Sequence, residues 1–501
     1  MTRMNRILLL LSVFATVGAC GCSPKNENDT PEEPAFERYV QNLEIKSEIL
    51  NTKVPFSIYL PEGYDKDLDK SYAVVYMLHG HGDNHNSWNG NYLHANTKIN
   101  TLVKTSGLSD MIYVFPEGFT TYYCNYYTGK YAYMDMFIQE LIPYIDANYR
   151  TIPDRQHRSI TGYSMGGFGA LALAEKHPET FLCSAPLSMS FRTDWQYMSE
   201  SQSGWDQQWG KIFGGIAKAG AERLTDYYKE HCPYYQFVPE NKETLSAVKW
   251  YLICGDNEEN LLYANDTLHV QLRDLGYEHE YRVVDGGHSS SVWMPALDEV
   301  LPMFDHYMNG ASAWPACAKA MYKKQDVAFR EDGTAFSKAY TGAEQGLGVY
   351  LFHKALPEQT LKDVMSVLYT VNTKYLCVYM PCDLTKKSVA EWVEYYGALY
   401  PQNKRAAVCM EGTGASVMAD QAPFEAMLFV DTALGTDISA DPSRKYYFSC
   451  TDESACYADY GTLYRICKRG GIEFEYRVIN ATGEPEDILR CADQLKSYIP
   501  Y

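Results

Sequence analysis

The stretch Gly162-Tyr163-Ser164-Met165-Gly166-Gly167 constrains the fold of this chain more than any other segment. Residues 158–161 precede it as the end of a predicted buried strand, and the alanine- and leucine-rich run 168–174 after it predicts a helix. Small residues beside a serine permit the sharp strand-to-helix turn that exposes its hydroxyl group. Ser164 is therefore a candidate nucleophile, and the backbone amide of Met165 is a candidate oxyanion donor.

Length and composition limit what the chain can be. With 501 residues it is longer than one ordinary domain, so two domains are expected. The net charge of −19 argues against nucleic acid and anionic membranes as partners. The 43 tyrosines suit a surface that binds sugars or aromatic groups, and they suit ordinary packing equally well.

The 14 cysteines form neither a disulfide framework nor a zinc-binding pattern. Four of them lie in apolar, strand-like runs, which predicts buried free thiols: Cys254, Cys377, Cys409 and Cys450. No metal or other cofactor is expected.

The N-terminus predicts export. Two arginines precede the apolar run 7–17, which is too short for a mature transmembrane helix. Cys20 ends a lipobox-like Val-Gly-Ala-Cys and is the expected lipidation site, with Cys22 as a second candidate and a plain secretory peptide as the alternative. We expect a lipoprotein signal peptide at 1–22 and a disordered acidic tether at 23–36. The mature protein would be a membrane-anchored lipoprotein, periplasmic or on the cell surface, with membrane contact only through the lipid.

Residues 37–310 alternate predicted strands and helices. The runs 72–78, 111–115 and 250–254 are continuously apolar, which is typical of buried parallel strands. Apolar residues recur at helical spacing in 134–149. This pattern predicts a doubly wound α/β sheet, whose ligands bind at the carboxyl ends of the strands.

Two more loops follow predicted strands of this domain. The glycine-rich loop 79–82 lets backbone amides approach a developing oxyanion, with the His81 amide as the second candidate donor. His288 lies in a glycine-containing loop after the strand 281–284, where a general base belongs. Ser164 and His288 are thus expected to meet at one edge of the sheet.

The acid that would orient His288 falls in the loop after strand 250–254. Asp256, Glu258 and Glu259 compete for this role, which is to hold the imidazole in one tautomer. The chain order serine, acid, histidine is that of α/β-hydrolases.

Four segments carry a resemblance to a known family: 78–82, 140–146, 149–152 and 162–167. Together they resemble the putative esterase family of α/β-hydrolases, which includes feruloyl esterases, acetyl xylan esterases, esterase D and the antigen 85 acyltransferases. The resemblance covers the first domain. It implies a triad acid three residues after the glycine of the acid loop, which favours Glu258 narrowly over Asp256.

The resemblance, with export, implies an exported serine esterase that removes feruloyl or acetyl groups from a plant polysaccharide such as xylan. The alternatives are an acyltransferase of antigen 85 type and a catalytically inactive surface glycan-binding lipoprotein. Aromatic side chains near the serine could contact substrate or simply pack a lid. The candidate substrate contacts are Tyr126, Tyr127, Trp205 and Trp293.

After a linker at 311–325, residues 326–501 repeat the pattern of the first domain. The runs 445–450 and 474–479 parallel 249–254 and 279–284 in the same order. The chemistry does not recur.

Glu411 falls at the position of Ser164, and Gly483 falls at that of His288. We therefore expect a degenerate, non-catalytic α/β-hydrolase-like repeat, which caps the site, binds a ligand or mediates homo-oligomerisation.

Overall fold

The computed structural model describes residues 37–495, except 91, 259, 312–328, 337–345, 369–376, 421, 436–437 and 484–485. The predicted signal peptide, the tether, Cys20, Cys22 and most of the predicted linker lie outside the described residues. Among the helices of the described part, none combines the length and the apolar character that a membrane span requires.

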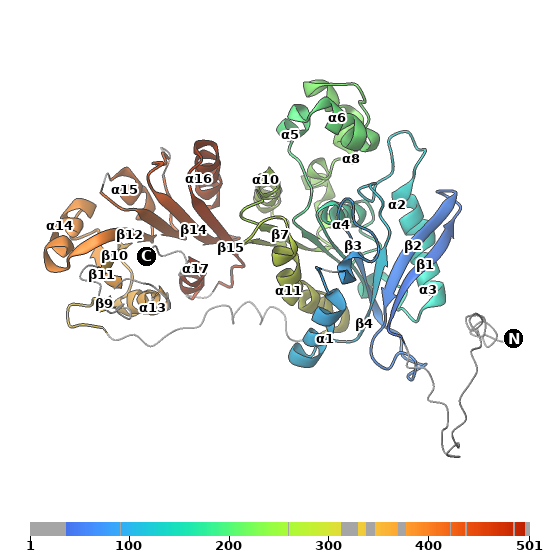
Figure 1. Ribbon diagram of the computed structural model, residues 1–501, viewed down its shortest axis with the longest axis horizontal. Helices are drawn as coiled ribbons and strands as arrows, with labels where there is room; N and C mark the ends of the chain where they lie inside the picture. The colour runs from blue at the N-terminus through green and yellow to red at the C-terminus, as the bar shows by residue number, and fades with distance from the viewer. Residues whose placement is uncertain are drawn as a thin grey trace, which may run out of the picture. The chain divides into compact units, whose positions relative to one another are not determined.

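The described residues form one mostly parallel sheet of fifteen strands with helices on both faces (Figure 1). This confirms the predicted α/β class. The strands of the first half are β1 (Tyr39–Ser47), β2 (Thr52–Tyr59), β3 (Ala73–Leu78), β4 (Met111–Pro116), β5 (Arg158–Tyr163), β6 (Cys183–Leu187), β7 (Lys249–Gly255) and β8 (His279–Val284). From β4 to β8 the neighbouring strands are parallel, in the order β4-β3-β5-β6-β7-β8.

Helices connect these strands and shape the site. The longer ones are α1 (Ala95–Ser106), α4 (Met165–Lys176), α10 (Asn260–Asp274) and α11 (Ser290–Asn309). The predicted helix at 134–149 is divided into α2 (Tyr133–Met136), a π turn and α3 (Ile142–Asn148). Between β6 and β7 lies an insertion of short helices: α5 (Asp194–Ser199), α6 (Gln202–Gly204), α7 (Gly210–Phe213), α8 (Asp226–His231) and α9 (Lys242–Leu245).

The second half has its own strands and covering helices. The strands are β9 (Ala335–Phe336), β10 (Gly346–His353), β11 (Cys377–Asp383), β12 (Gln402–Met410), β13 (Ala426–Val430), β14 (Lys445–Thr451) and β15 (Phe474–Ile479). The helices are α13 (Glu358–Leu368), α14 (Val389–Leu399), α15 (Gly414–Ala419), α16 (Tyr457–Gly470) and α17 (Asp487–Leu495). Their strand order β11-β10-β12-β13-β14-β15 has the same connectivity as β4-β3-β5-β6-β7-β8.

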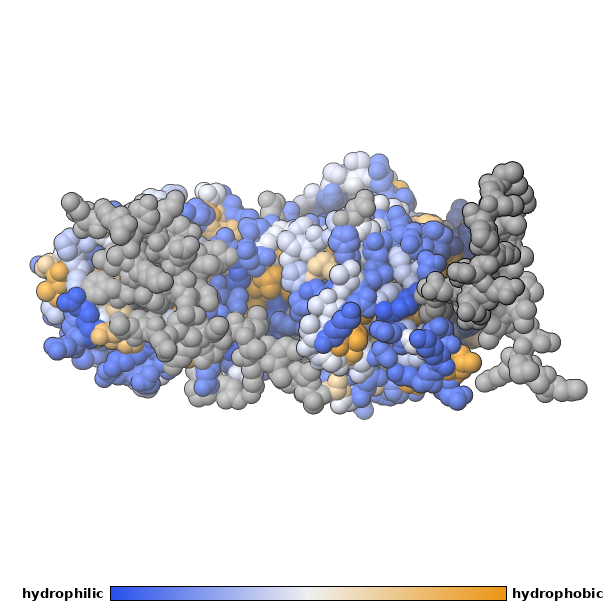
Figure 2. All heavy atoms as spheres, turned by 60° about the horizontal axis from the view of Figure 1, so that its bottom comes forward, coloured by the Kyte–Doolittle hydropathy of each residue, from blue (hydrophilic) through white to orange (hydrophobic). Residues whose placement is uncertain are grey.

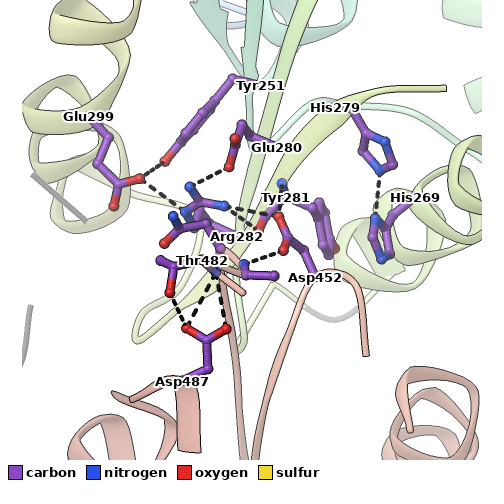
Figure 3. Close-up of polar contacts among 12 residues, drawn as sticks. Tyr251, His269, His279, Glu280, Tyr281, Arg282, Glu299, Asp452, Thr482 and Asp487 are labelled. Atoms are coloured by element: carbon purple, nitrogen blue, oxygen red, sulfur yellow. Dashed lines mark hydrogen bonds and ion pairs between the residues drawn. The ribbon is translucent and has the colours of Figure 1, made fainter. Parts of the chain in front are cut away.

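The two halves meet where β8 pairs with β15, and this junction is called the seam below. The pairing is antiparallel, with Val283 opposite Val478. Figure 3 shows Arg282 of β8 pointing toward Asp452, which follows β14. Its buried guanidinium contacts Asp452 at 3.3 Å, Glu280 at 2.7 Å and Glu299 at 3.0 Å. Because β8 and β15 are antiparallel, the strands of the two halves run in opposite directions. The carboxyl ends of the strands of one half therefore lie on the same side as the amino ends of the strands of the other half.

Apolar side chains fill both faces of the central strands, as expected for parallel sheets. The predicted free thiols of Cys254, Cys377, Cys409 and Cys450 are buried within strands, without disulfides. On the face shown in Figure 2, apart from the grey atoms, hydrophobic residues appear in small groups among hydrophilic ones.

Candidate active site

The turn between β5 and α4 holds Ser164 in a strained backbone conformation. Ser164 has φ 57° and ψ −117°, a region that residues with a side chain rarely adopt. The neighbouring glycines permit the turn, because a Cβ atom on Gly166 would lie 2.4 Å from the carbonyl oxygen of Leu78. A Cβ on Gly162 would lie 2.5 Å from the carbonyl oxygen of Gly166. The observed backbone is the sharp strand-to-helix turn that the sequence predicts around Ser164.

The structure brings together Ser164, His288 and Glu258. His288 Nε2 lies 2.8 Å from Ser164 Oγ, and His288 Nδ1 lies 2.7 Å from Glu258 Oε2. The Glu258 side chain is fully buried, whereas the His288 side chain is 37% exposed. With a proton on Nδ1 donated to the carboxylate, Nε2 is free to accept the proton of the serine hydroxyl.

Asp256, the alternative acid, has different partners. Its Oδ1 accepts a hydrogen bond from the Gly286 amide at 3.1 Å, and its Oδ2 accepts one from the Tyr476 amide at 3.2 Å. It also forms an ion pair with Arg477 of β15. Asp256 therefore ties the acid loop and the histidine loop to the second half, while Glu258 contacts His288.

A cluster of carboxylates surrounds the same arginine. Oxygens of Asp256, Asp285 and Glu475 lie within 4.8 Å of one another, close enough to share a metal ion. Arg477 contacts each of the three and supplies a positive charge between them. Arg477 thus offsets part of the negative charge of the cluster.

Ser188 supports the acid, and sequence reasoning missed it. Its hydroxyl donates to Glu258 Oε1 at 2.5 Å, and the Gly255 amide donates to the same oxygen at 2.7 Å. Trp293 Nε1 in turn donates to Ser188 Oγ at 2.9 Å. Ser188 directly follows β6. The sequence could therefore have indicated it, because ligands of such sheets bind at the carboxyl ends of the strands.

Trp293 packs against His288 rather than lining an open surface. It is 6% exposed, stacks on Tyr163 at 4.4 Å between ring centroids, and meets the His288 ring edge-on at 5.1 Å. This position supports His288 and Ser188, so the predicted substrate contact of Trp293 has no support in this geometry.

The other predicted substrate contacts lie in two places. Tyr127 is 51% exposed, and its amide donates to the carbonyl of Lys211 in the insertion at 2.8 Å. Tyr126 is partly buried against Tyr131, with ring centroids 5.5 Å apart. Trp205 is fully buried and donates to the carbonyl of Gly215 at 2.9 Å, so it packs the insertion and offers no surface to a ligand.

The candidate oxyanion donors come from two neighbouring segments. Met165 is the first residue of α4, and His81 lies in the loop after β3. This loop is fastened to the elbow, because the Tyr163 hydroxyl donates to Asp83 at 2.6 Å. Burial raises the pKa of Tyr163, so the phenol keeps the proton that it donates. The His79 amide also donates to the Tyr123 hydroxyl at 2.9 Å.

The second half has a corresponding turn between β12 and α15. Glu411 occupies it with φ 52°, close to the value at Ser164. Its carboxylate accepts hydrogen bonds from the amides of Lys354 at 3.2 Å and Ala355 at 2.7 Å, in the loop after β10. Ala355 corresponds to His81 in the first half. In the second half, amides of the loop after β10 thus donate to an oxygen of the residue that corresponds to Ser164.

A buried hydrogen bond also recurs with its donor and acceptor exchanged. Ser188 and Asp431 follow equivalent strands with φ of 44° and 45°. Ser188 donates to Glu258, whereas in the second half Ser454 donates to Asp431. The second half therefore has a serine where the first half has its acid.

The fold and these contacts are those expected of the α/β-hydrolase class. The profile of the putative esterase family matches residues 47–304, about half of the chain. The chain belongs to this family.

Similar proteins include several esterases. An endo-1,4-beta-xylanase/feruloyl esterase of Xylanibacter ruminicola is 26% identical over 271 residues, covering 52% of this chain and 30% of that protein. Esterase Rv1288 of Mycobacterium tuberculosis is 27% identical over 249 residues, covering 46% of this chain and 52% of that protein. The chain thus spans a third to a half of the length of these relatives. A solved ferulic acid esterase is 28% identical, with a TM-score of 0.45, covering 54% of this chain and 97% of that one.

Proposed function

We propose that this protein is a serine carboxylic-ester hydrolase with Ser164 as nucleophile, His288 as general base and Glu258 as the acid of the triad. The observation that carries the proposal is the hydrogen-bonded chain from Ser164 Oγ through His288 to the buried Glu258. A glycan-binding protein without catalysis has no need of this arrangement or of the strained turn at Ser164.

The reaction follows from the positions of these atoms. His288 Nε2 takes the proton of Ser164 as Oγ attacks the ester carbonyl carbon, and Glu258 stabilises the imidazolium that forms. The imidazolium then protonates the leaving alcohol oxygen, which leaves an acyl group on Ser164. Water, deprotonated by His288, attacks the acyl group, and Ser164 leaves with the returned proton.

The amides of His81 and Met165 would stabilise the oxyanion in both steps. The corresponding turn of the second half supports this assignment, because the amide of Ala355 there donates to a Glu411 oxygen.

The substrate we propose is a feruloyl or acetyl ester on a plant polysaccharide such as xylan. The name of the Xylanibacter relative, which joins a xylanase to a feruloyl esterase, supports this choice. Transfer of the acyl group to a sugar hydroxyl would use the same residues, and product analysis with and without an acceptor sugar distinguishes it.

We also infer that residues 326–501 are a degenerate copy of the first domain. Support comes from the common strand order and from the left-handed turns at Glu411 and Asp431. Glu411, Ser454 and Gly483 stand where the nucleophile, acid and base would be, so the copy has no triad.

The test is hydrolysis of methyl ferulate and p-nitrophenyl acetate by the mature protein. We expect Ser164→Ala to lose the activity, whereas Ser106→Ala, at an exposed serine of α1, retains it. Activity that persists in Ser164→Ala, or no activity in the unsubstituted protein, would contradict the proposal.

Export as a lipoprotein anchored at Cys20 remains a separate proposal. Labelling of the full chain with a radioactive fatty acid in a bacterial host tests it, with Cys20→Ala expected to abolish labelling and Cys22→Ala to retain it. Unchanged labelling of Cys20→Ala would favour Cys22.

A further inference from the structure

A groove runs between α10 of the first half and α16 of the second. Two hollows of about 570 and 730 Å³ form it, and Tyr263 and Arg465 lie in the walls of both. The two hollows therefore lie next to each other along α10 and α16.

One end of this groove lies at the edge of the sheet that carries the triad. Because β8 and β15 are antiparallel, the start of α10 lies beside the end of α16. Asn260, the first residue of α10, lines the smaller hollow together with Lys468 and Arg469 from the end of α16. Asn260 is two residues beyond Glu258 in the chain, so this hollow opens beside the acid loop.

The lining of the smaller hollow is unlike the rest of this acidic protein. Besides Asn260 it consists of three aromatic and three basic residues and contains no acid: Trp195, Tyr263, Tyr464, Arg465, Lys468 and Arg469. The chain as a whole has 63 acidic and 44 basic residues, so a wall with three bases and no acid is a marked local reversal of charge.

Among the residues of this hollow, Trp195 and Arg469 are exposed, whereas Tyr464 is only 3% exposed and packs edge-on against Phe474. Arg465 donates to the Thr462 hydroxyl at 3.0 Å, and Lys468 Nζ lies 5.0 Å from the centre of the Phe474 ring. Trp195 is 63% exposed, which is unusual for so large an apolar side chain. The Arg465 guanidinium lies 5.6 Å from the centre of the Tyr263 ring. Among the ion pairs between described residues, none involves Arg465, Lys468 or Arg469. The helix dipole favours bases in the last turn of α16, but it does not explain the aromatic wall opposite them.

We propose that the smaller hollow of this groove binds a polysaccharide that carries carboxylate groups, such as uronic acid substituents on a xylan backbone, and that the bound chain presents its esters to Ser164. Aromatic faces stack on the apolar faces of sugar rings, and guanidinium groups pair with carboxylates through two parallel hydrogen bonds. Presentation of the esters rests on the proposed function, whereas binding of the acidic chain does not.

Binding is measured with Ser164→Ala, so that no ester is cleaved during the titration. The ligands are glucuronoxylan and the same xylan after chemical reduction of its carboxyl groups, which leaves the backbone unchanged. We expect binding to glucuronoxylan to be at least tenfold tighter than to the reduced chain, and to weaken as salt rises. Equal affinity for the two ligands would overturn the proposal.

The groove is tested with R465S/K468S/R469S in the Ser164→Ala background. Its control is K46S/K66S/K104S, which removes three exposed lysines from the first half. We expect at least tenfold weaker binding to glucuronoxylan for the groove variant and no change for the control. If the triple variant unfolds, Arg469→Ser and Trp195→Ser, both at exposed positions, replace it. Unchanged affinity in folded groove variants would overturn the proposal.

Hydrolysis of methyl ferulate, a small neutral ester, separates this proposal from the proposed function. Methyl ferulate hydrolysis is measured on the unsubstituted protein, and binding of glucuronoxylan is measured on Ser164→Ala. Charge-dependent binding without any ester hydrolysis would refute the esterase and keep the groove. Hydrolysis of methyl ferulate without charge-dependent binding of glucuronoxylan would refute the groove and keep the esterase.

Discussion

Arg282 and Arg477 occupy equivalent positions on the antiparallel strands of the seam, and each contacts an aspartate of the other half. Arg282 lies 3.3 Å from Asp452, and Arg477 pairs with Asp256. Each aspartate also accepts the amide of the residue before the opposite arginine, at 3.4 Å for Asp452 and 3.2 Å for Asp256. The seam thus resembles an isologous contact between two copies of one domain, formed here within a single chain.

The two aspartates predict different effects on catalysis. Asp256→Asn weakens the ion pair with Arg477, which lies beside the loops that carry Glu258 and His288. Asp452→Asn instead weakens the contact with Arg282 in strand β8. We expect both Asp→Asn variants to lower the melting temperature, since each leaves a buried arginine short of its partner. Only Asp256→Asn should lower kcat, with KM unchanged. Equal kcat in both variants would show that the seam has no role in positioning the triad.

Ser188 predicts a second effect on the triad. Ser188→Ala removes a hydrogen bond to the Glu258 carboxylate, and a bond to a charged group contributes about 1.5–3 kcal/mol. If the loss appears in the transition state, kcat falls by roughly tenfold to a hundredfold. Steady-state kinetics on methyl ferulate measures the change, with Ser106→Ala as the control. A kcat within twofold of the unsubstituted protein would mean that the Gly255 amide holds Glu258 sufficiently.

The sequence predicted the strands and most of the candidate site because both follow local rules. Apolar runs predicted β3, β4 and β7, and the position of a loop after a strand predicted Ser164, His288 and an acid loop with three candidates. Only the family resemblance favoured Glu258 among these three. The partners of Asp256 could not be predicted in this way. Its ion pair with Arg477 joins residues far apart in the chain, and it depends on the pairing of β8 with β15, which no local pattern encodes.

Buried aromatic residues show the same limit. The sequence offers Trp205 and Trp293 as candidate substrate contacts. Whether an aromatic ring faces the substrate or packs in the interior depends on the tertiary structure, and both rings are buried. The indole nitrogen of Trp205 finds its partner at Gly215, 10 residues away, and that of Trp293 finds its partner at Ser188, 105 residues away.

The glycines of the elbow predict a steric effect. In Gly166→Ala the new Cβ would lie 2.4 Å from the carbonyl oxygen of Leu78, so β3 and the loop after it must move away from the elbow. We expect loss of esterase activity and a lower melting temperature. Gly397→Ala is the control, because a Cβ there meets nothing within 4 Å in α14 and should stabilise the helix by about 0.5–1 kcal/mol. Full activity of Gly166→Ala would contradict the tight packing of the turn.

Glu175 predicts a pH dependence of stability. Its side chain is buried in α4 without a hydrogen-bond partner, and burial raises its pKa from 4.5 to about 8. Between these pH values the folded protein keeps a proton that the unfolded chain has released. The free energy of unfolding therefore falls as pH rises through this window, by up to about 1.4 kcal/mol per pH unit.

Glu175→Gln removes this group and should flatten the profile. We expect the variant to melt at a higher temperature than the unsubstituted protein at pH 8, and the difference to shrink toward pH 5. Calorimetric melting across this range measures it, with the exposed Glu62→Gln as control. Parallel profiles for Glu175→Gln and the unsubstituted protein would rule out a buried, protonated Glu175.

Glu411 predicts that the second half cannot be made catalytic by restoring its serine. Glu411→Ser would place a hydroxyl on the left-handed turn and free the amides of Lys354 and Ala355. However, Ser454 and Gly483 would supply neither the acid nor the base that the hydroxyl needs. We therefore expect Ser164→Ala/Glu411→Ser to show no esterase activity and no labelling by a fluorophosphonate probe, while the protein with Ser164 is labelled. Labelling of the double variant would show that the second half retains a working base, and that it is not a degenerate copy.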